Sequence, residues 1–124
     1  MASVVIVGGT EETRLLLRGL LRLYRHRVVG EGPTFRSLGT VSPPDPHPTV
    51  AVIDLDLEDP EAVQSIQRAK SESPGLRILL LSANRTAAIE TRAREVGVDA
   101  LIRRPFAVHE LMESIEPPEP TRQP

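Results

Sequence analysis

An apolar run that ends in a carboxylate, Val-Ala-Val-Ile-Asp from Val50 to Asp54, is the strongest constraint on the fold of this 124-residue chain. An unbroken apolar run leaves no side of a strand for water, so it predicts a central strand covered on both faces, as in a parallel sheet. A carboxylate that closes such a strand lies at the carboxyl edge of the sheet, where open α/β folds bind ligands. The edge around Asp54 is therefore the predicted site.

The rest of the chain alternates between short apolar strands and helical stripes. Further strands are predicted at residues 4–7, 27–31, 78–81 and 100–102, and helices at 11–24, 35–41, 61–72, 86–96 and 108–115. This alternation predicts an α/β fold, with a doubly wound five-stranded parallel sheet, five helices on its two faces and right-handed crossovers. We expect one domain over residues 1–116, followed by a Pro-rich tail or linker over 117–124.

The first predicted helix carries two side-chain patterns. Thr10 is its expected cap, and Glu11 and Glu12 fall in the first turn, where the helix dipole favours carboxylates. The stripe expected to pack on the sheet consists of Leu16, Leu20 and Leu23, with Leu17 and Tyr24. Basic residues recur at every fourth position on another face, at Arg14, Arg18 and Arg22. We interpret the basic residues as a solvent-facing stripe, with contact to an acidic partner as the alternative.

Composition narrows the classes of function. The chain has no cysteine, which excludes disulfides, thiolate catalysis and Cys-zinc sites. A formal net charge of −2 and only three aromatic residues argue against a nucleic-acid-binding surface. The first residues lack the character of a signal peptide, and no apolar run approaches the roughly 18 residues that a membrane span needs. We therefore expect a cytoplasmic protein without a membrane partner.

The other predicted strands also end in residues that suit a phosphate site. Gly8 and Gly9 follow the first strand, Ser82 follows the fourth and Arg104 follows the fifth. These residues should meet Asp54 at one edge. There a carboxylate can act as nucleophile, while a hydroxyl and a cation hold phosphate oxygens.

Four segments resemble the receiver domain of bacterial two-component response regulators. They are His47–Asp54, Ile78–Ala83, Ala93–Ala100 and Arg104–Phe106. The resemblance covers nearly the whole chain and implies a flavodoxin-like sheet with strand order 2-1-3-4-5. It also implies that Asp54 occupies the phosphoacceptor position, that Ser82 is the switch hydroxyl, and that Arg104 takes the position of the family's lysine.

The chain departs from the family pattern at the metal site. Gly8 and Gly9 occupy the positions of the acidic pair that holds the divalent metal. Mg²⁺ prefers carboxylates and waters in near-octahedral array. Asp54 and a backbone carbonyl near Asp56 would be the remaining protein ligands, so we expect weak Mg²⁺ binding or no cofactor at all. Glu11 or Glu12 could reach into the site instead, but we favour their role at the helix terminus.

Two further positions also differ from the family. Arg104 is bulkier than lysine and has a planar, forked head, so it could bridge Asp54 permanently and imitate an activated state. Leu101 stands at the aromatic switch position. Together these departures predict an atypical or pseudo-receiver, a non-enzymatic phosphorelay domain that acts mainly through protein contacts. Its expected partners are a sensor histidine kinase, an output protein or a second copy, bound at the face of the last two helices and fifth strand.

Other interpretations remain open from the sequence. Asp54 could be the working acceptor of a conventional receiver, or the edge of the sheet could have no activity. From another class, Val4–Thr10 resembles the opening of dinucleotide-binding reductases, with Glu31 as a ribose-binding acid. The dinucleotide-binding fingerprint needs a third small residue for close packing of helix and strand, but the spacing places Thr13 or Arg14 at that position. The chain is either a single-domain protein or a fragment that precedes an output domain.

Overall fold

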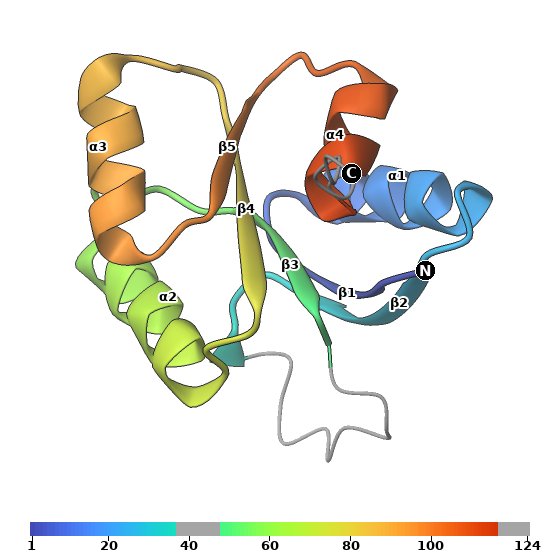
Figure 1. Ribbon diagram of the computed structural model, residues 1–124, viewed down its shortest axis with the longest axis horizontal. Coiled ribbons are helices and arrows are strands. Elements are labelled where there is room, and N and C mark those ends of the chain that lie inside the picture. Colours follow the sequence, from blue (N-terminus) through green and yellow to red (C-terminus); the bar gives the residue numbers. More distant parts are fainter. Residues whose placement is uncertain (37–47, 117–124) are drawn as a thin grey trace, which may run out of the picture.

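The computed structural model describes residues 1–36 and 48–116, which form one parallel sheet and four helices (Figure 1). The elements are β1 (Ser3–Gly8), α1 (Glu11–Leu23), β2 (Arg27–Gly32), β3 (Val50–Asp54), α2 (Pro60–Glu72), β4 (Arg77–Ser82), α3 (Ala87–Val96), β5 (Ala100–Arg103) and α4 (Val108–Ile115). All neighbouring strands pair in parallel, in the order β2-β1-β3-β4-β5. The predicted strand order is confirmed.

The described residues contain four helices, whereas the sequence predicts five. The remaining predicted helix, over residues 35–41, falls mainly on residues 37–47, which lie outside the described residues. The predicted tail over residues 117–124 lies outside them too. Across the two described ranges, every helix is too short or too polar to cross a membrane.

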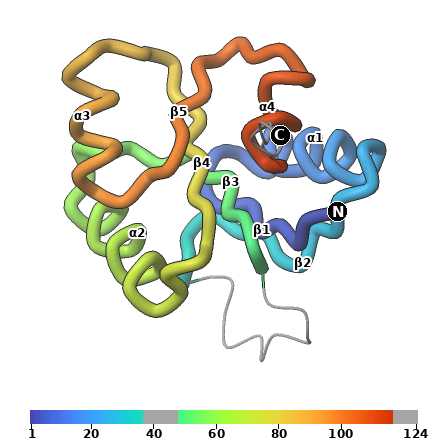
Figure 2. Tube along the Cα trace, in the orientation of Figure 1, coloured from blue at the N-terminus to red at the C-terminus, as the bar shows by residue number. Residues whose placement is uncertain are grey.

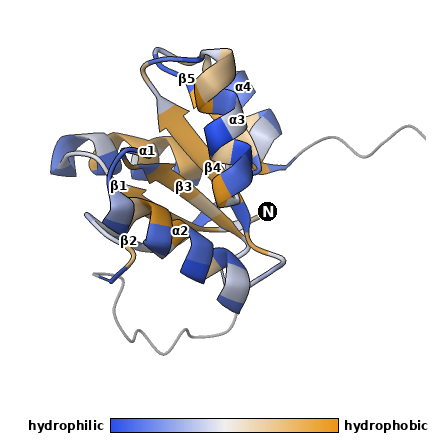
Figure 3. Cartoon of the chain, turned by 90° about the vertical axis from the view of Figure 1, so that its left-hand side faces the viewer, coloured by the Kyte–Doolittle hydropathy of each residue, from blue (hydrophilic) through white to orange (hydrophobic). Residues whose placement is uncertain are grey.

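Helices cover both faces of the sheet. α1 and α4 lie on one face, and α2 and α3 lie on the other, as the ribbon and the chain trace show (Figures 1 and 2). The interior of β3 is buried, as predicted, because its side chains alternate between the two layers. Val50 and Val52 join the α1–α4 core, while Ala51 and Ile53 join the α2–α3 core. The hydropathy colouring accordingly shows the central strands as an apolar layer between amphipathic helices (Figure 3).

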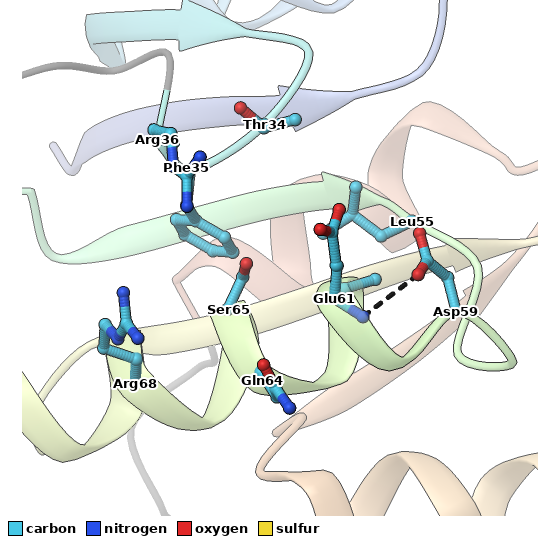
Figure 4. A pocket seen from close by; sticks show the side chains of 10 residues that line it. Thr34, Phe35, Arg36, Leu55, Asp59, Glu61, Gln64, Ser65 and Arg68 are labelled. Carbon is cyan, nitrogen blue, oxygen red and sulfur yellow. Dashed lines mark hydrogen bonds between the residues drawn. The ribbon is translucent and has the colours of Figure 1, made fainter.

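The helices begin and end at residues suited to those positions. The Thr10 hydroxyl accepts a hydrogen bond from the Thr13 N–H at 3.1 Å, as an N-cap does. Asp59 caps α2 through a 3.0 Å bond from the Glu61 N–H (Figure 4). α3 ends at Gly97, whose φ of 114° lies in the left-handed region that glycine adopts without strain.

The predicted inward stripe of α1 is wrong in most of its members. Leu17 and Leu21 are the buried leucines, with 3% and 0% of their surface exposed, whereas Leu16, Leu23 and Tyr24 are exposed. α1 carries leucine on nearly every side, so periodicity did not reveal which side packs against the sheet. Leu17 and Leu21 are the leucines that pack with the side chains of β1 in the core.

This orientation of α1 predicts unequal costs for two identical substitutions. Leu21→Ala should lower the free energy of unfolding by about 2–5 kcal/mol, because it leaves a cavity in the core. Leu16→Ala should change it by less than about 0.5 kcal/mol, because the side chain is already exposed. Urea unfolding followed by circular dichroism measures both values. Equal losses for the two variants would contradict the observed facing of α1.

Candidate functional site

The predicted site residues meet at the carboxyl edge of the sheet. Gly8 pairs with Asp54 across β1 and β3, and Ser82 pairs with Arg103 across β4 and β5. The Arg104 N–H then donates to the Ser82 carbonyl at 2.8 Å, which fixes the chain just after β5. An open groove of about 820 Å³ lies over this edge, between the segment after β3 and the start of α3. Its lining includes Asp54, Asp56, Ser82, Arg92 and Arg104.

An ion pair joins the acid and the cation of this edge. The Arg104 guanidinium donates through Nη1 to Asp54 Oδ2 at 2.7 Å. The Asp54 side chain is 19% exposed and that of Arg104 is 36% exposed. An ion pair this open to solvent stabilises the fold by no more than about 1 kcal/mol. Its main consequence is positional, because it holds a fixed positive charge against one oxygen of the carboxylate.

The Gly8–Gly9 turn closes the edge from the side of β1. Both glycines have positive φ, 88° and 69°, and the Gly9 N–H donates to the Asp54 carbonyl at 3.1 Å. A Cβ on Gly8 would overlap that carbonyl, and a Cβ on Gly9 would stand 2.9 Å from Asp54 Oδ2. An acidic residue at Gly8 would therefore clash with backbone, and one at Gly9 would be strained by the positive φ and would displace the Asp54 carboxylate.

Arg14 is a residue of this edge that the sequence analysis missed. Its guanidinium donates through Nη1 to the carbonyls of Gly9 at 2.8 Å and Gly8 at 3.3 Å, which fastens the glycine turn to α1. Arg18 is also paired, with Glu31 at 2.9 Å. The predicted solvent-facing stripe thus holds only for Arg22, which is exposed. The role of Arg14 could not be predicted from its spacing, because its acceptors are backbone carbonyls and every residue type has one.

Two other polar residues of the edge are engaged locally. The Ser82 hydroxyl donates to the Asn84 carbonyl at 2.7 Å and accepts from the Asn84 N–H at 3.2 Å, so it turns toward its own loop. Asp56 Oδ1 accepts from the Glu58 N–H at 2.9 Å. Both side chains form local turns of the kind that Ser and Asp favour.

The residues present do not fit the divalent metal that the family resemblance implies. Across residues 1–36 and 48–116, no three His, Asp or Glu side chains gather into a group that could hold a metal ion. Asp54 faces Arg104, Asp56 closes its own turn, and Glu11 and Glu12 are exposed on α1. Octahedral Mg²⁺ with several protein oxygens needs a denser set of ligands than this edge offers.

Two further features bear on the alternative interpretation as a dinucleotide-binding domain. Glu31, its expected ribose-binding acid, accepts from Arg18 through Oε1, so that oxygen is already engaged. A smaller pocket of about 210 Å³ lies between residues 34–36 and α2, where Phe35 lies over the helix (Figure 4). Asp54 and Arg104 are not part of its lining. Neither feature joins the Gly8–Gly9 turn to a nucleotide-sized site.

Similarity to known proteins points to one family, although no protein-family model matches the chain. The transcriptional regulatory protein PhoP of Escherichia coli is 31% identical over 65 residues, which are 52% of this chain and 29% of PhoP. The transcriptional regulatory protein BasR of the same organism is 28% identical over 102 residues, 82% of this chain and 46% of BasR. The chain thus spans less than half the length of either relative.

Solved structures agree on the fold. The chemotaxis protein CheY4 of Vibrio cholerae superposes with a TM-score of 0.75 at 17% identity, covering 92% of this chain and 95% of CheY4. The chain is therefore similar in sequence to response regulators and in fold to their receiver domains. The resemblance indicated by the sequence motifs is confirmed.

The closed glycine turn predicts that a side chain at Gly9 destabilises the fold. Gly9→Ala should cost at least about 1–2 kcal/mol of unfolding free energy, the cost of a left-handed conformation for an L-residue, because the added Cβ also meets Asp54. Gly75→Ala is the matched control, since no atom lies within 4 Å of its Cβ position. It should stay within about 0.5 kcal/mol of wild type. A Gly9→Ala protein as stable as the control in urea would show that the turn is not closed.

Proposed function

We propose that this chain, a receiver domain of the response-regulator type by sequence and by fold, works as an atypical receiver. It transmits signals through protein contacts, with weak or no Mg²⁺-dependent phosphorylation of Asp54. The observation that carries the proposal is the surroundings of the Asp54 carboxylate. A guanidinium bonds to one of its oxygens at 2.7 Å, and a glycine turn stands where a metal-binding carboxylate would be needed.

The chemical reason concerns the charge on the transferred group. Phosphoryl transfer to a carboxylate is catalysed mainly by cations that neutralise the phosphoryl oxygens and the leaving group. Arg104 supplies one positive charge, but it faces Asp54 itself. Without further metal ligands, both gain and loss of a phosphoryl group on Asp54 should be slow. A signal would then pass through a partner that binds one conformation more tightly than another.

The expected contact surface is the face formed by α3, β5 and α4. Leu101, at the family's aromatic position, is partly buried there against the α2–α3 core. Arg85, Glu90, Arg94 and Glu110 line a polar groove on the same face. Charges of both signs suit a protein surface with its own mixed charges. The partner we propose is a sensor histidine kinase or an output protein, and this domain itself has no enzymatic activity.

One observation favours the alternative, a conventional receiver that is phosphorylated on Asp54. The Asp54 side chain is 19% exposed and lines the open groove of about 820 Å³, so a small phosphoryl donor can reach it. The two proposals differ in rate and in metal dependence, which can be measured separately.

Phosphorylation is tested by intact mass after incubation with acetyl phosphate and Mg²⁺. We expect little or no phosphoryl adduct on the wild-type chain, because the metal ligands needed to neutralise the donor are lacking. Asp54→Ala is the control for phosphorylation elsewhere. Complete and Mg²⁺-dependent conversion of wild type to an adduct that is absent from Asp54→Ala would contradict the proposal and favour the conventional receiver.

Metal binding is tested by thermal unfolding. A ligand at 100 times its dissociation constant stabilises the folded state by about 2.7 kcal/mol. Because we expect no such site, 10 mM MgCl₂ should shift the Tm by less than about 1 °C relative to NaCl of equal ionic strength. If MgCl₂ raised the Tm by several degrees and Asp54→Asn abolished this rise, the edge would contain a metal site, contrary to our expectation.

A further inference from the structure

The outward side of α1 is the main exposed apolar surface among the described residues. Five large apolar side chains are recorded as exposed, and apart from Met1 they all belong to α1 or its C-cap: Leu15 (56%), Leu16 (62%), Leu23 (74%) and Tyr24 (49%). At 100° per residue, these three leucines lie on the side of α1 opposite the buried Leu17 and Leu21. Exposed apolar patches of this kind mark sites of protein association.

Gly19 lies at the centre of this side. No atom lies within 4 Å of its Cβ position, so the glycine faces open space. It stands one turn after Leu15 and Leu16 and one turn before Leu23. A glycine costs helix stability, but it lets the backbone of another helix approach closely. Gly19 thus leaves a gap in the row of exposed side chains, between Leu16 and Leu23.

The charges at the two ends of α1 are opposite. Glu11 and Glu12 occupy the first turn, and Arg22 and Arg25 stand at the last turn and just beyond it. All four are exposed, and none has an ion-pair partner within the described residues. A surface that is acidic at one end, apolar in the middle and basic at the other end is complementary to itself when it is reversed.

We propose that α1 is a self-association surface, on which a second copy of this chain packs its own α1 antiparallel about Gly19. In this two-fold arrangement Leu16 of each copy faces Leu23 of the other. The acidic first turn of each copy lies beside the basic end of its partner. Antiparallel packing also sets the two helix dipoles in their favourable relative direction. Because each copy uses the same surface, such an isologous contact gives a closed dimer and no open filament.

The size of the surface sets the expected strength. α1 has 13 residues, so its length is about 20 Å. One helix pair of this length buries less than the roughly 1,200 Å² of a standard interface, which places the dimer in the weak, transient class. The basic end of this surface adjoins α4, because Tyr24 and Arg25 line a pocket together with Met112 of α4. The inference holds whether or not Asp54 accepts phosphate.

Sedimentation analysis over a range of protein concentrations tests the dimer. The wild-type chain should pass from monomer to dimer as its concentration rises. Gly19→Lys should weaken this association at least about 10-fold, because it fills the crossing point and opposes two like charges there. Lysine has a higher helix propensity than glycine, so the monomer should still fold. Gly75→Lys, the same change at another open position, should associate like wild type.

Charge reversal tests the antiparallel direction. One variant carries Glu11→Arg and Glu12→Arg, and the other carries Arg22→Glu and Arg25→Glu. Each variant alone brings like charges together at both ends of the pair and should remain monomeric. An equimolar mixture of the two restores opposite charges at both ends, so a dimer should form again, at an affinity within about 10-fold of wild type.

Three results would overturn the proposal. Wild type could remain monomeric at every concentration, or its dimer could be unaffected by Gly19→Lys, which would move the contact to another face. The mixture of the two charge variants could also stay monomeric although each is folded by circular dichroism. If α1 instead binds a different protein, the wild-type chain stays monomeric, which is the first of these results.

Discussion

The close contact between the Gly8–Gly9 turn and Asp54 decides what the carboxyl edge of this sheet can hold. The Gly9 N–H bonds to the Asp54 carbonyl, a Cβ on Gly8 would overlap that carbonyl, and a Cβ on Gly9 would stand 2.9 Å from Asp54 Oδ2. β1 therefore ends in backbone alone, without a carboxylate that could face Asp54. Every charged side chain at this edge therefore comes from other segments: Asp54 ends β3, Asp56 follows it, Arg92 belongs to α3 and Arg104 follows β5.

Two arginines hold Asp54 and the groups next to it by hydrogen bonds. Arg104 bonds to the Asp54 carboxylate, and Arg14 bonds to the carbonyls of Gly8 and Gly9. A guanidinium keeps its charge at any physiological pH, and unlike a metal ion it cannot dissociate from the chain. The charge balance around Asp54 is thus built into the covalent structure. This is the physical basis for proposing a receiver whose surface, more than its phosphorylation, carries the signal.

α1 connects the edge of the sheet to the outer surface. Thr10 caps the helix, and Arg14 in its first turn bonds to the glycine turn. Leu17 and Leu21 on its inward side are buried in the core. The sheet needs only one side of the helix. The leucines on the other side remain exposed, which is why the same helix can position the edge and present a surface to a second molecule.

The sequence by itself determined the parallel sheet and the gathering of Asp54, Ser82 and Arg104 at one edge. Those predictions rest on short-range patterns, namely apolar runs and the residues that follow them. Only the tertiary structure decided which leucines of α1 are buried, where Arg14 donates and that the glycine turn closes over Asp54. These outcomes depend on the angle at which elements cross and on distances between residues far apart in the chain. One-dimensional periodicity does not contain that information.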